Sequence, residues 1–285
     1  MKIAHLILAH AAPEQLSKLI GSLEHRDAWF FVHLDGKADI RTFPFLQDRE
    51  RVVLVPDRVD VGWGAYSIVE ATLRGFQAVV NSGIDFGYVN LLSGADYPLR
   101  SPLEIHDFFA RNNGKNFMEY CSVHNEWTEA IPRLTEYHLT NYNFPGKYLV
   151  QKWVNRLLPM RKMPAGLEPV GRSQWMSLTL DAVRYILEYL DGHPVVKKFF
   201  KLTWAPDEII FQTILYNSPF RSSLVNDNLR YIDWSKGQAS PKVLTEEDLE
   251  HMWASGKLFA RKFDLTQFPA VIGELDRKIQ DHHYK

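Results

Sequence analysis

Residues 1–110 alternate between short apolar runs and amphipathic helical patterns, and this alternation constrains the fold more strongly than any other feature of the chain. Apolar runs typical of buried strands fall at residues 2–10, 29–35, 51–56 and 86–93, and helical patterns fall at 13–25 and 66–83. Strands that alternate with helices favour an α/β domain with a largely parallel sheet. Ligands of such sheets bind beyond the carboxyl ends of the strands, so the loops at 33–37 and 93–100 are predicted to line a site.

The middle of the chain is predicted to be less regular. Residues 112–169 are rich in Tyr, Asn, Pro and basic side chains, with short helices expected around 148–158, which is typical of an insertion or a flexible lid. Residues 172–190 then predict a strand followed by a helix, and Thr245 with Asp248 predicts a further helix start. We interpret residues 1–285 as one domain.

Composition excludes several classes of function. A formal net charge of −1, without a basic stripe, argues against a nucleic-acid partner. Cys121 is the only cysteine, so it can form no intramolecular disulfide; we expect a structural role for it and a reducing compartment. The apolar stretch at the amino terminus is too short for a signal peptide. No later run approaches the roughly 18 apolar residues that a membrane-spanning helix needs. The sequence therefore predicts a cytoplasmic protein without a transmembrane segment, and leaves peripheral membrane contact open.

Two adjacent acids, Asp207 and Glu208, stand between Pro206 and an apolar helical run. Proline suits the first position of a helix, so both acids are predicted in a first helical turn. There they would complement the helix dipole, an effect worth about 0.3–1 kcal/mol each. Alternatively, a carboxylate at the rim of a pocket is available as a base. The local sequence leaves both interpretations open.

Common nucleotide-binding, zinc-protease and serine-hydrolase motifs are absent, but six segments in order resemble a known family. The chain is similar to the core-2/I-branching β-1,6-N-acetylglucosaminyltransferases, a family that includes the peptide O-xylosyltransferases. The resemblance covers nearly the whole chain. The segments that carry it are "FFVHLDGKAD", "VGWGAYSIVEATL", "YVNLLSGADYPLRSPLEI", "GRSQWMSLT", "APDEIIFQTIL" and "LFARKFD".

This resemblance implies a GT-A nucleotide-sugar transferase that inverts the anomeric centre without a divalent metal. Residues 1–110 would then form the nucleotide-binding half, and residues 111–285 the acceptor and catalytic half, with 112–169 as its variable segment. In the family the Glu of the "PDE" segment is the catalytic base, and it matches Glu208. Arg230 and Lys262 match the cations that bind the diphosphate.

The resemblance also implies contacts to the nucleoside and to the sugars. His10, His33 and Asp35 lie where the first two strands would hold the uridine, and Asp96 falls on the sugar side. The acceptor side is less closely matched, because the chain departs from the branching enzymes there. Its candidate residues are Glu119, Arg133 and Trp175.

Elementary chemistry supports the same division of roles. An inverting transfer needs one carboxylate to take the proton of the acceptor hydroxyl. The departing diphosphate builds negative charge, which a metal or fixed cations must meet. Metal-using GT-A enzymes generally carry Asp-X-Asp, which this sequence lacks, so we expect an arginine and a lysine to serve instead.

Structural alternatives remain for several of these residues. Arg230 could be a surface arginine, and Arg261 could take the phosphate role of Lys262. His33 could be a core histidine, while Asp35 and Asp96 could brace their loops. Trp63 and Trp175 could belong to the core or to a pocket wall.

The resemblance leaves the donor open between UDP-GlcNAc and UDP-xylose, and the acceptor open among glycans and glycoconjugates. No amino-terminal anchor and no disulfide cysteines of the animal Golgi enzymes are present, so we expect a bacterial member of the family. A protein that keeps the fold and binds sugar or sugar nucleotide without catalysis is the alternative. No cofactor is expected beyond the donor itself.

Overall fold

The computed structural model describes residues 1–283, with side chains described through residue 281. Its main sheet has seven strands in the order β3-β2-β1-β4-β7-β6-β8. All neighbouring strands are parallel except β7, which runs antiparallel to β4 and β6. The predicted α/β fold with a mostly parallel sheet is thus confirmed. The strands are β1 (Ile3–Ala9), β2 (Ala28–Leu34), β3 (Val52–Leu54), β4 (Tyr88–Ser93), β6 (Asn116–Ser122), β7 (Val170–Thr179) and β8 (Leu224–Asn226).

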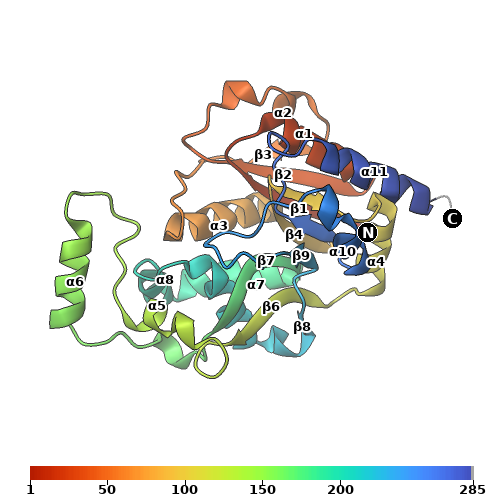
Figure 1. Ribbon diagram of the computed structural model, residues 1–285. Coiled ribbons are helices and arrows are strands. Elements are labelled where there is room, and N and C mark those ends of the chain that lie inside the picture. Colours follow the sequence, from red (N-terminus) through yellow and green to blue (C-terminus); the bar gives the residue numbers. More distant parts are fainter. Residues whose placement is uncertain (284–285) are drawn as a thin grey trace.

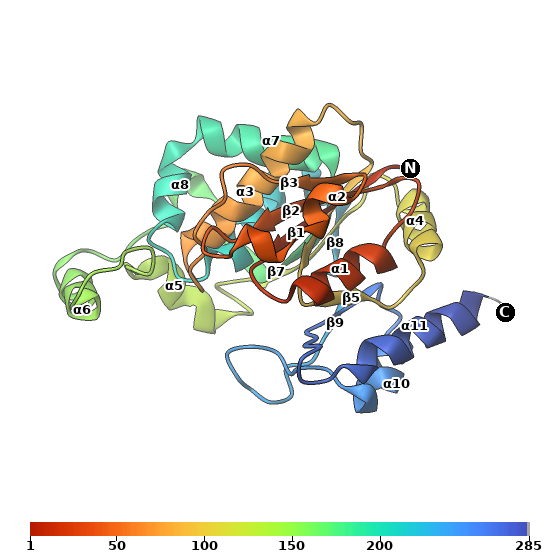
Figure 2. The same cartoon turned by 90° about the horizontal axis from the view of Figure 1, so that it is seen from above.

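Helices cover both faces of this sheet, as Figures 1 and 2 show. In β1, Ala4 and Leu6 join one buried apolar cluster, and Ile3 and Ile7 join the other. Because successive side chains of a strand point to opposite faces, an uninterrupted apolar run buries both. The first face is covered by α3 (Tyr66–Asn81), α7 (Leu180–Gly192) and α9 (Ile210–Tyr216), and the second by α1 (Pro13–Ser22), α4 (Pro102–Arg111), α10 (Leu249–Ala254) and α11 (Ala270–His283).

A second, three-stranded sheet lies over the second face and has the order β5-β10-β9. Its strands are β5 (Asp96–Pro98), β10 (Phe259–Arg261) and β9 (Arg230–Ile232). The residues after β4 were predicted to form only a loop, but part of them pairs with β10, so that Asp96 lies opposite Arg261. This pairing unites segments that are far apart in the sequence.

The segment 112–169 is more regular than predicted. Its first part is β6, a strand inside the main sheet, because Asn116, Phe117 and Met118 are buried there. The helix expected around 148–158 forms as α6 (Lys147–Leu157). The other helices are α2 (Phe45–Asp48), α5 (Ile131–Thr135) and α8 (Pro194–Phe200), and 3₁₀ turns span Ile40–Thr42, Thr128–Ala130, Pro164–Gly166, Pro206–Glu208, Pro219–Ser223 and Glu246–Asp248.

The helix start predicted at Thr245 and Asp248 is confirmed, as a 3₁₀ turn before α10. The Thr245 backbone N–H donates to the Asp248 carboxylate over 3.0 Å.

Cys121 is half-buried in β6, where burial raises the pKa of its thiol. Its Sγ lies 3.4 Å from the carbonyl oxygen of Gly171, in keeping with a structural role.

Candidate active site

One edge of the main sheet gathers most of the predicted site residues. β1, β2 and β4 end there, and the antiparallel pairing of Asn90 with Ser177 brings the start of β7 to the same edge. The pairing of Ser122 with Val170 adds the end of β6. Open α/β sheets bind their ligands at this edge, as the sequence predicted.

The turn Pro206–Glu208 lies at this edge and is separate from the helix that follows. Ile209, with φ of −130°, ends the turn, and α9 begins only at Ile210. The prediction that both acids occupy the first turn of that helix is therefore wrong. The turn is tied to the loop after β3, because the Ala205 N–H donates to the Gly64 carbonyl over 2.8 Å.

Glu208 forms an ion pair with Arg133, whose Nη1 lies 2.6 Å from Glu208 Oε2. The Glu208 and Arg133 side chains are 29% and 16% exposed, so the pair is partly open to solvent and within reach of a ligand. The guanidinium of Arg133 contacts two indole rings, 4.6 Å from the centroid of Trp127 and 4.4 Å from that of Trp204. These two cation–π contacts restrict the orientation of Arg133, and through it that of Glu208.

Trp63 extends this aromatic group to the solvent. Its ring meets that of Trp204 edge-on at 5.6 Å, and 66% of the residue is exposed. The interpretation of Trp63 as a core residue is therefore wrong. Exposed indole faces beside a carboxylate form a surface suited to the apolar face of a sugar.

Asp207 has a different environment from its neighbour. It is 6% exposed, and its Oδ1 has no hydrogen-bond partner within the described part of the chain. Burial, together with the charge of Glu208, raises its pKa to about 7. Asp207 was predicted to cap or brace the helix, but no side chain caps α9. Of the two acids, Glu208 is the one that is accessible to a ligand.

A cavity of about 430 Å³ lies beside the end of β6 and contains Glu119. Its carboxylate accepts a hydrogen bond of 2.8 Å from Asn228 Nδ2, and burial raises its pKa against the opposing charges of Arg172 and Lys257. Arg172, whose charge acts on Glu119, lies 5.5 Å from the ring of Trp127, which Arg133 also contacts. The cavity is lined by Glu119, Asn226, Asp227, Asn228, Arg230, Ile232, Trp234 and Lys257.

Arg230 lines this cavity and is only 3% exposed, so the surface alternative is wrong. Its Nη2 donates to Asn90 Oδ1 and to the Leu91 carbonyl, both over 2.6 Å. Its Nη1 donates to the Asn228 carbonyl. Burial lowers its pKa to about 10. Because the guanidinium donates these bonds to protein atoms, Arg230 holds the wall of the cavity in place.

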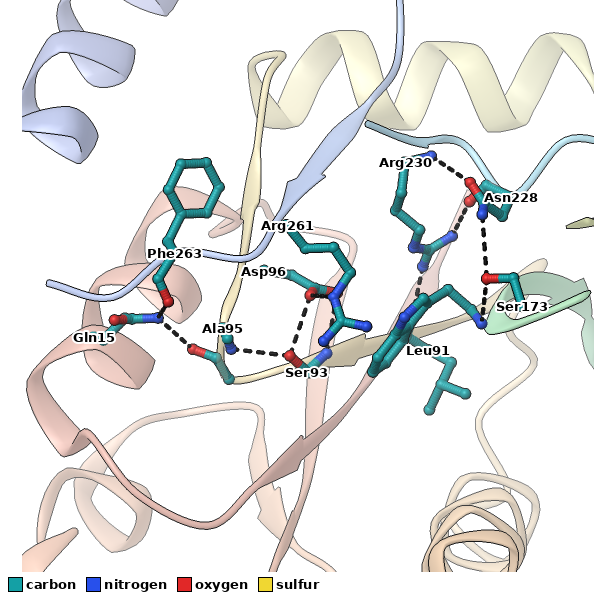
Figure 3. Close-up of polar contacts among 12 residues, drawn as sticks. Gln15, Leu91, Ser93, Ala95, Asp96, Ser173, Asn228, Arg230, Arg261 and Phe263 are labelled. Atoms are coloured by element: carbon teal, nitrogen blue, oxygen red, sulfur yellow. Dashed lines mark hydrogen bonds and ion pairs between the residues drawn. The ribbon is translucent and has the colours of Figure 1, made fainter. Parts of the chain in front are cut away.

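Asp96 is fully buried and braces its loop, as the structural alternative proposed. It accepts hydrogen bonds of 3.1 Å from the N–H and the hydroxyl of Ser93, and pairs with Arg261 Nε at 3.1 Å (Figure 3). Burial raises the pKa of Asp96, and Arg261 opposes the rise. The Arg261 guanidinium also lies 3.9 Å from the ring of Trp175, which is 5% exposed.

These contacts separate the roles of two adjacent cations. Arg261 is held by Asp96 and Trp175. Lys262 is half-buried, and within residues 1–283 its ammonium has neither an ion pair nor a hydrogen bond. Of the two, Lys262 is the cation available to an anionic ligand.

The residues predicted to hold the uridine lie at the ends of β1 and β2. His33 is 1% exposed, accepts a hydrogen bond of 3.0 Å from the Val59 N–H at Nε2, and has a pKa lowered by burial, so it is a core histidine. Asp35 accepts from the N–H groups of Lys37 and Val61 and braces two loops. His10 is exposed where β1 ends.

Sequence reasoning missed four residues that shape the site, Trp127, Arg172, Trp204 and Asn228. Among them, only Trp204 could have been singled out from the sequence, because it stands two residues before Pro206. Trp127, Arg172 and Asn228 are brought to the site only by the packing of segments around β6 and β7. No group of three or more His, Cys, Asp or Glu side chains that could hold a metal occurs in the described residues.

Gly171→Ala is expected to disturb the turn that carries Glu208. A Cβ at this position would collide with the Glu208 carbonyl oxygen and lie 2.9 Å from Ile209 Cα, and neither backbone group can rotate away. We expect a loss of about 1–3 kcal/mol in unfolding free energy, and about tenfold or more in activity because the base shifts. Denaturant titration and initial rates measure both.

Gly21→Ala in α1 is the matched control. Nothing lies within 4 Å of the added methyl group, so this variant should be as stable as the parent or more stable by about 0.5–1 kcal/mol. Equal behaviour of the two alanine variants would contradict the packing of Gly171 against the turn.

Comparisons with known proteins add to this geometry. A family model described as "Core-2/I-Branching enzyme" matches residues 3–253. Xylosyltransferase 2 of Bos taurus is 26% identical over 309 aligned residues, which cover 97% of this chain and 33% of the relative. The xylosyltransferase of Ciona intestinalis is 23% identical, covering 98% of this chain and 34% of the relative. The chain thus spans about a third of the length of these relatives.

Proposed function

Because the chain belongs to the core-2/I-branching enzyme family, we propose that it transfers xylose or N-acetylglucosamine from a UDP-sugar to a hydroxyl group of a glycan or glycoconjugate. The transfer inverts the anomeric centre and uses no divalent metal. The observation that carries the proposal is the Glu208 carboxylate, held by Arg133 among indole rings at the sheet edge where ligands bind.

Glu208 acts as the base in this proposal. Arg133 contacts Oε2 and leaves Oε1 for the acceptor hydroxyl. As the hydroxyl oxygen attacks the anomeric carbon, its proton passes to Glu208, and the bond from that carbon to the diphosphate oxygen breaks on the opposite face. Trp63 and Trp204 offer the stacking surface for the acceptor sugar.

The cations stabilise the leaving diphosphate by different means. Lys262 supplies a mobile point charge, which can follow the negative charge as it develops. Arg230 was predicted to touch the diphosphate. Its buried position favours a positioning role instead, in which its hydrogen bonds hold Asn90, Leu91 and Asn228 in place around the cavity. Asp96 similarly holds Arg261 in place.

The donor is expected to raise thermal stability without a metal. Thermal unfolding would be measured with UDP, UDP-xylose, UDP-GlcNAc and GDP-mannose, each with EDTA and with Mn²⁺. A ligand at about 100 times its Kd adds about 2.7 kcal/mol to the unfolding free energy. We expect UDP and one UDP-sugar to stabilise the protein equally under both conditions, and GDP-mannose to have no effect.

Two results would overturn parts of this proposal. Stabilisation that EDTA abolishes and Mn²⁺ restores would contradict the metal-independent diphosphate site. The absence of any response to uridine nucleotides would contradict the donor class. The difference between the responses to UDP-xylose and UDP-GlcNAc identifies the sugar.

A further inference from the structure

Helix α6 stands away from the rest of the molecule in both views (Figures 1 and 2). None of its residues is buried. Leu149 is 68% exposed, Trp153 60% and Leu157 73%. Apolar side chains of this size are expected to be covered when they gather on one face of a helix, because a contiguous apolar patch marks an interaction surface.

The helix is attached to the protein through its polar side. Asn155 and Gln151 lie on the face opposite the apolar residues, given about 3.6 residues per turn. The Tyr137 N–H donates to Asn155 Oδ1 over 2.7 Å, and Asn155 Nδ2 donates to the Tyr137 carbonyl over 3.0 Å. The Leu139 N–H donates to Gln151 Oε1 over 2.8 Å. The apolar face is therefore turned outward by specific hydrogen bonds.

Neighbouring residues enlarge this apolar face and add a tyrosine and a phenylalanine to it. Aromatic rings with one polar atom suit a boundary between an apolar phase and water. We refer to the whole set as the α6 patch. It consists of Tyr142, Phe144, Leu149, Val150, Trp153, Leu157, Leu158 and Met160, each at least 39% exposed.

The charge around the α6 patch has one sign. Residues 137–167 contain five basic side chains and no acidic one. On the helix, Lys147 borders the apolar face on one side and Arg156 on the other, as the helical period places them. Long basic side chains at these borders can extend their charges past an apolar layer toward anions.

We propose that the α6 patch docks the protein on a lipid surface with anionic headgroups. A helix with aromatic and aliphatic residues on one face and basic residues at its borders lies in the interface of such a surface, its apolar side chains among the acyl chains. Docking of a second copy on the same patch is disfavoured, because it would bring like charges together. No described helix is long and apolar enough to cross a bilayer, so the contact is peripheral.

Hydrogen bonds join the docking segment to the chain that leads into the site. Buried Arg161 donates to the carbonyls of Glu136, over 2.7 Å, and Leu202, over 2.6 Å, and the His138 N–H donates to the Leu202 carbonyl over 2.9 Å. Leu202 is followed by the segment that carries Trp204 and Glu208. Docking would thus hold Glu208 on the side of the protein that carries the membrane contact, where an acceptor carried on a lipid is met. That consequence rests on the proposed function, whereas the docking does not.

Co-sedimentation with vesicles tests the proposal independently of catalysis. Vesicles of phosphatidylcholine alone are compared with vesicles of phosphatidylcholine and phosphatidylglycerol. We expect about tenfold or more binding to the anionic vesicles, weakened by added salt. The variant Leu149→Ser/Trp153→Ser/Leu157→Ser should lose about tenfold or more of that binding. Lys147→Gln/Lys152→Gln/Arg156→Gln should lose the preference for anionic lipid.

Val195→Ser and Lys198→Gln, at exposed positions of α8, serve as matched controls and should bind vesicles like the parent. Because every substituted side chain is at the surface, thermal unfolding should show that all variants fold. Absence of binding to both vesicle types, or equal binding by the triple serine variant, would overturn the proposal. So would sedimentation velocity showing a dimer that the triple serine variant dissociates, since the patch would then join two copies.

Discussion

Glu208→Gln is expected to reduce the rate of sugar transfer by about 10²–10⁴, since a positioned general base contributes about this much. The amide keeps the size of the side chain and can still accept a hydrogen bond from Arg133, but it cannot take the acceptor proton. Binding of the UDP-sugar should change little, because the base contacts the acceptor. Initial rates and thermal shifts with donor separate the two effects.

Asp207→Asn is the matched control, since it changes the neighbouring carboxylate by the same chemistry. Asp207 is only 6% exposed, so its carboxylate offers little surface to an acceptor. Its amide variant should keep transfer within about tenfold of the parent. A larger loss in Asp207→Asn than in Glu208→Gln would reverse the assignment of the base.

Arg230→Met is expected to lower the unfolding free energy by about 2–5 kcal/mol, even without donor. The substitution removes the donor that Arg230 supplies to the carbonyls of Leu91 and Asn228, and leaves Asn90 Oδ1 with the Ser177 hydroxyl alone. An unpaired buried acceptor costs its desolvation free energy, which a methionine of similar length does not relieve. Urea titration of the unliganded protein measures the loss.

The control is Arg184→Met on α7, where the guanidinium is 46% exposed and pairs with Asp181 at the surface. That variant should stay within about 0.5 kcal/mol of the parent. If Arg230 served only to bind diphosphate, Arg230→Met would unfold at the same urea concentration as the parent and lose donor binding alone. Such a result would contradict its role in the wall of the cavity.

Some features followed from the sequence because local physics dictates them. The apolar runs of β1, β2 and β4 predicted buried parallel strands, since a run without polar alternation must cover both faces. The helix expected around residues 148–158 also forms, as α6. Six ordered segments indicated the family, which the family model then confirmed. That resemblance also singled out Glu208.

Other features depended on contacts between distant residues, which no local pattern encodes. Arg133 and Glu208 are 75 positions apart, and only the packing of α5 beside the Pro206–Glu208 turn brings them together. Arg230 was interpreted as a possible surface residue because it was expected to precede a strand, whereas it lies within β9, pairs with Phe259 of β10 and is buried. The break at Ile209 likewise reflects tertiary packing, because Gly171 of β7 contacts the backbone there.

The sequence by itself determined the α/β class, the family and the identity of the candidate base, because apolar periodicity and short ordered segments are properties of neighbouring residues. Only the tertiary structure decided which of the two acids is accessible to a ligand, which cations are free for a ligand, and which face of α6 meets the surroundings. Burial and hydrogen bonding determine these outcomes, and both arise when segments far apart in the chain pack against each other.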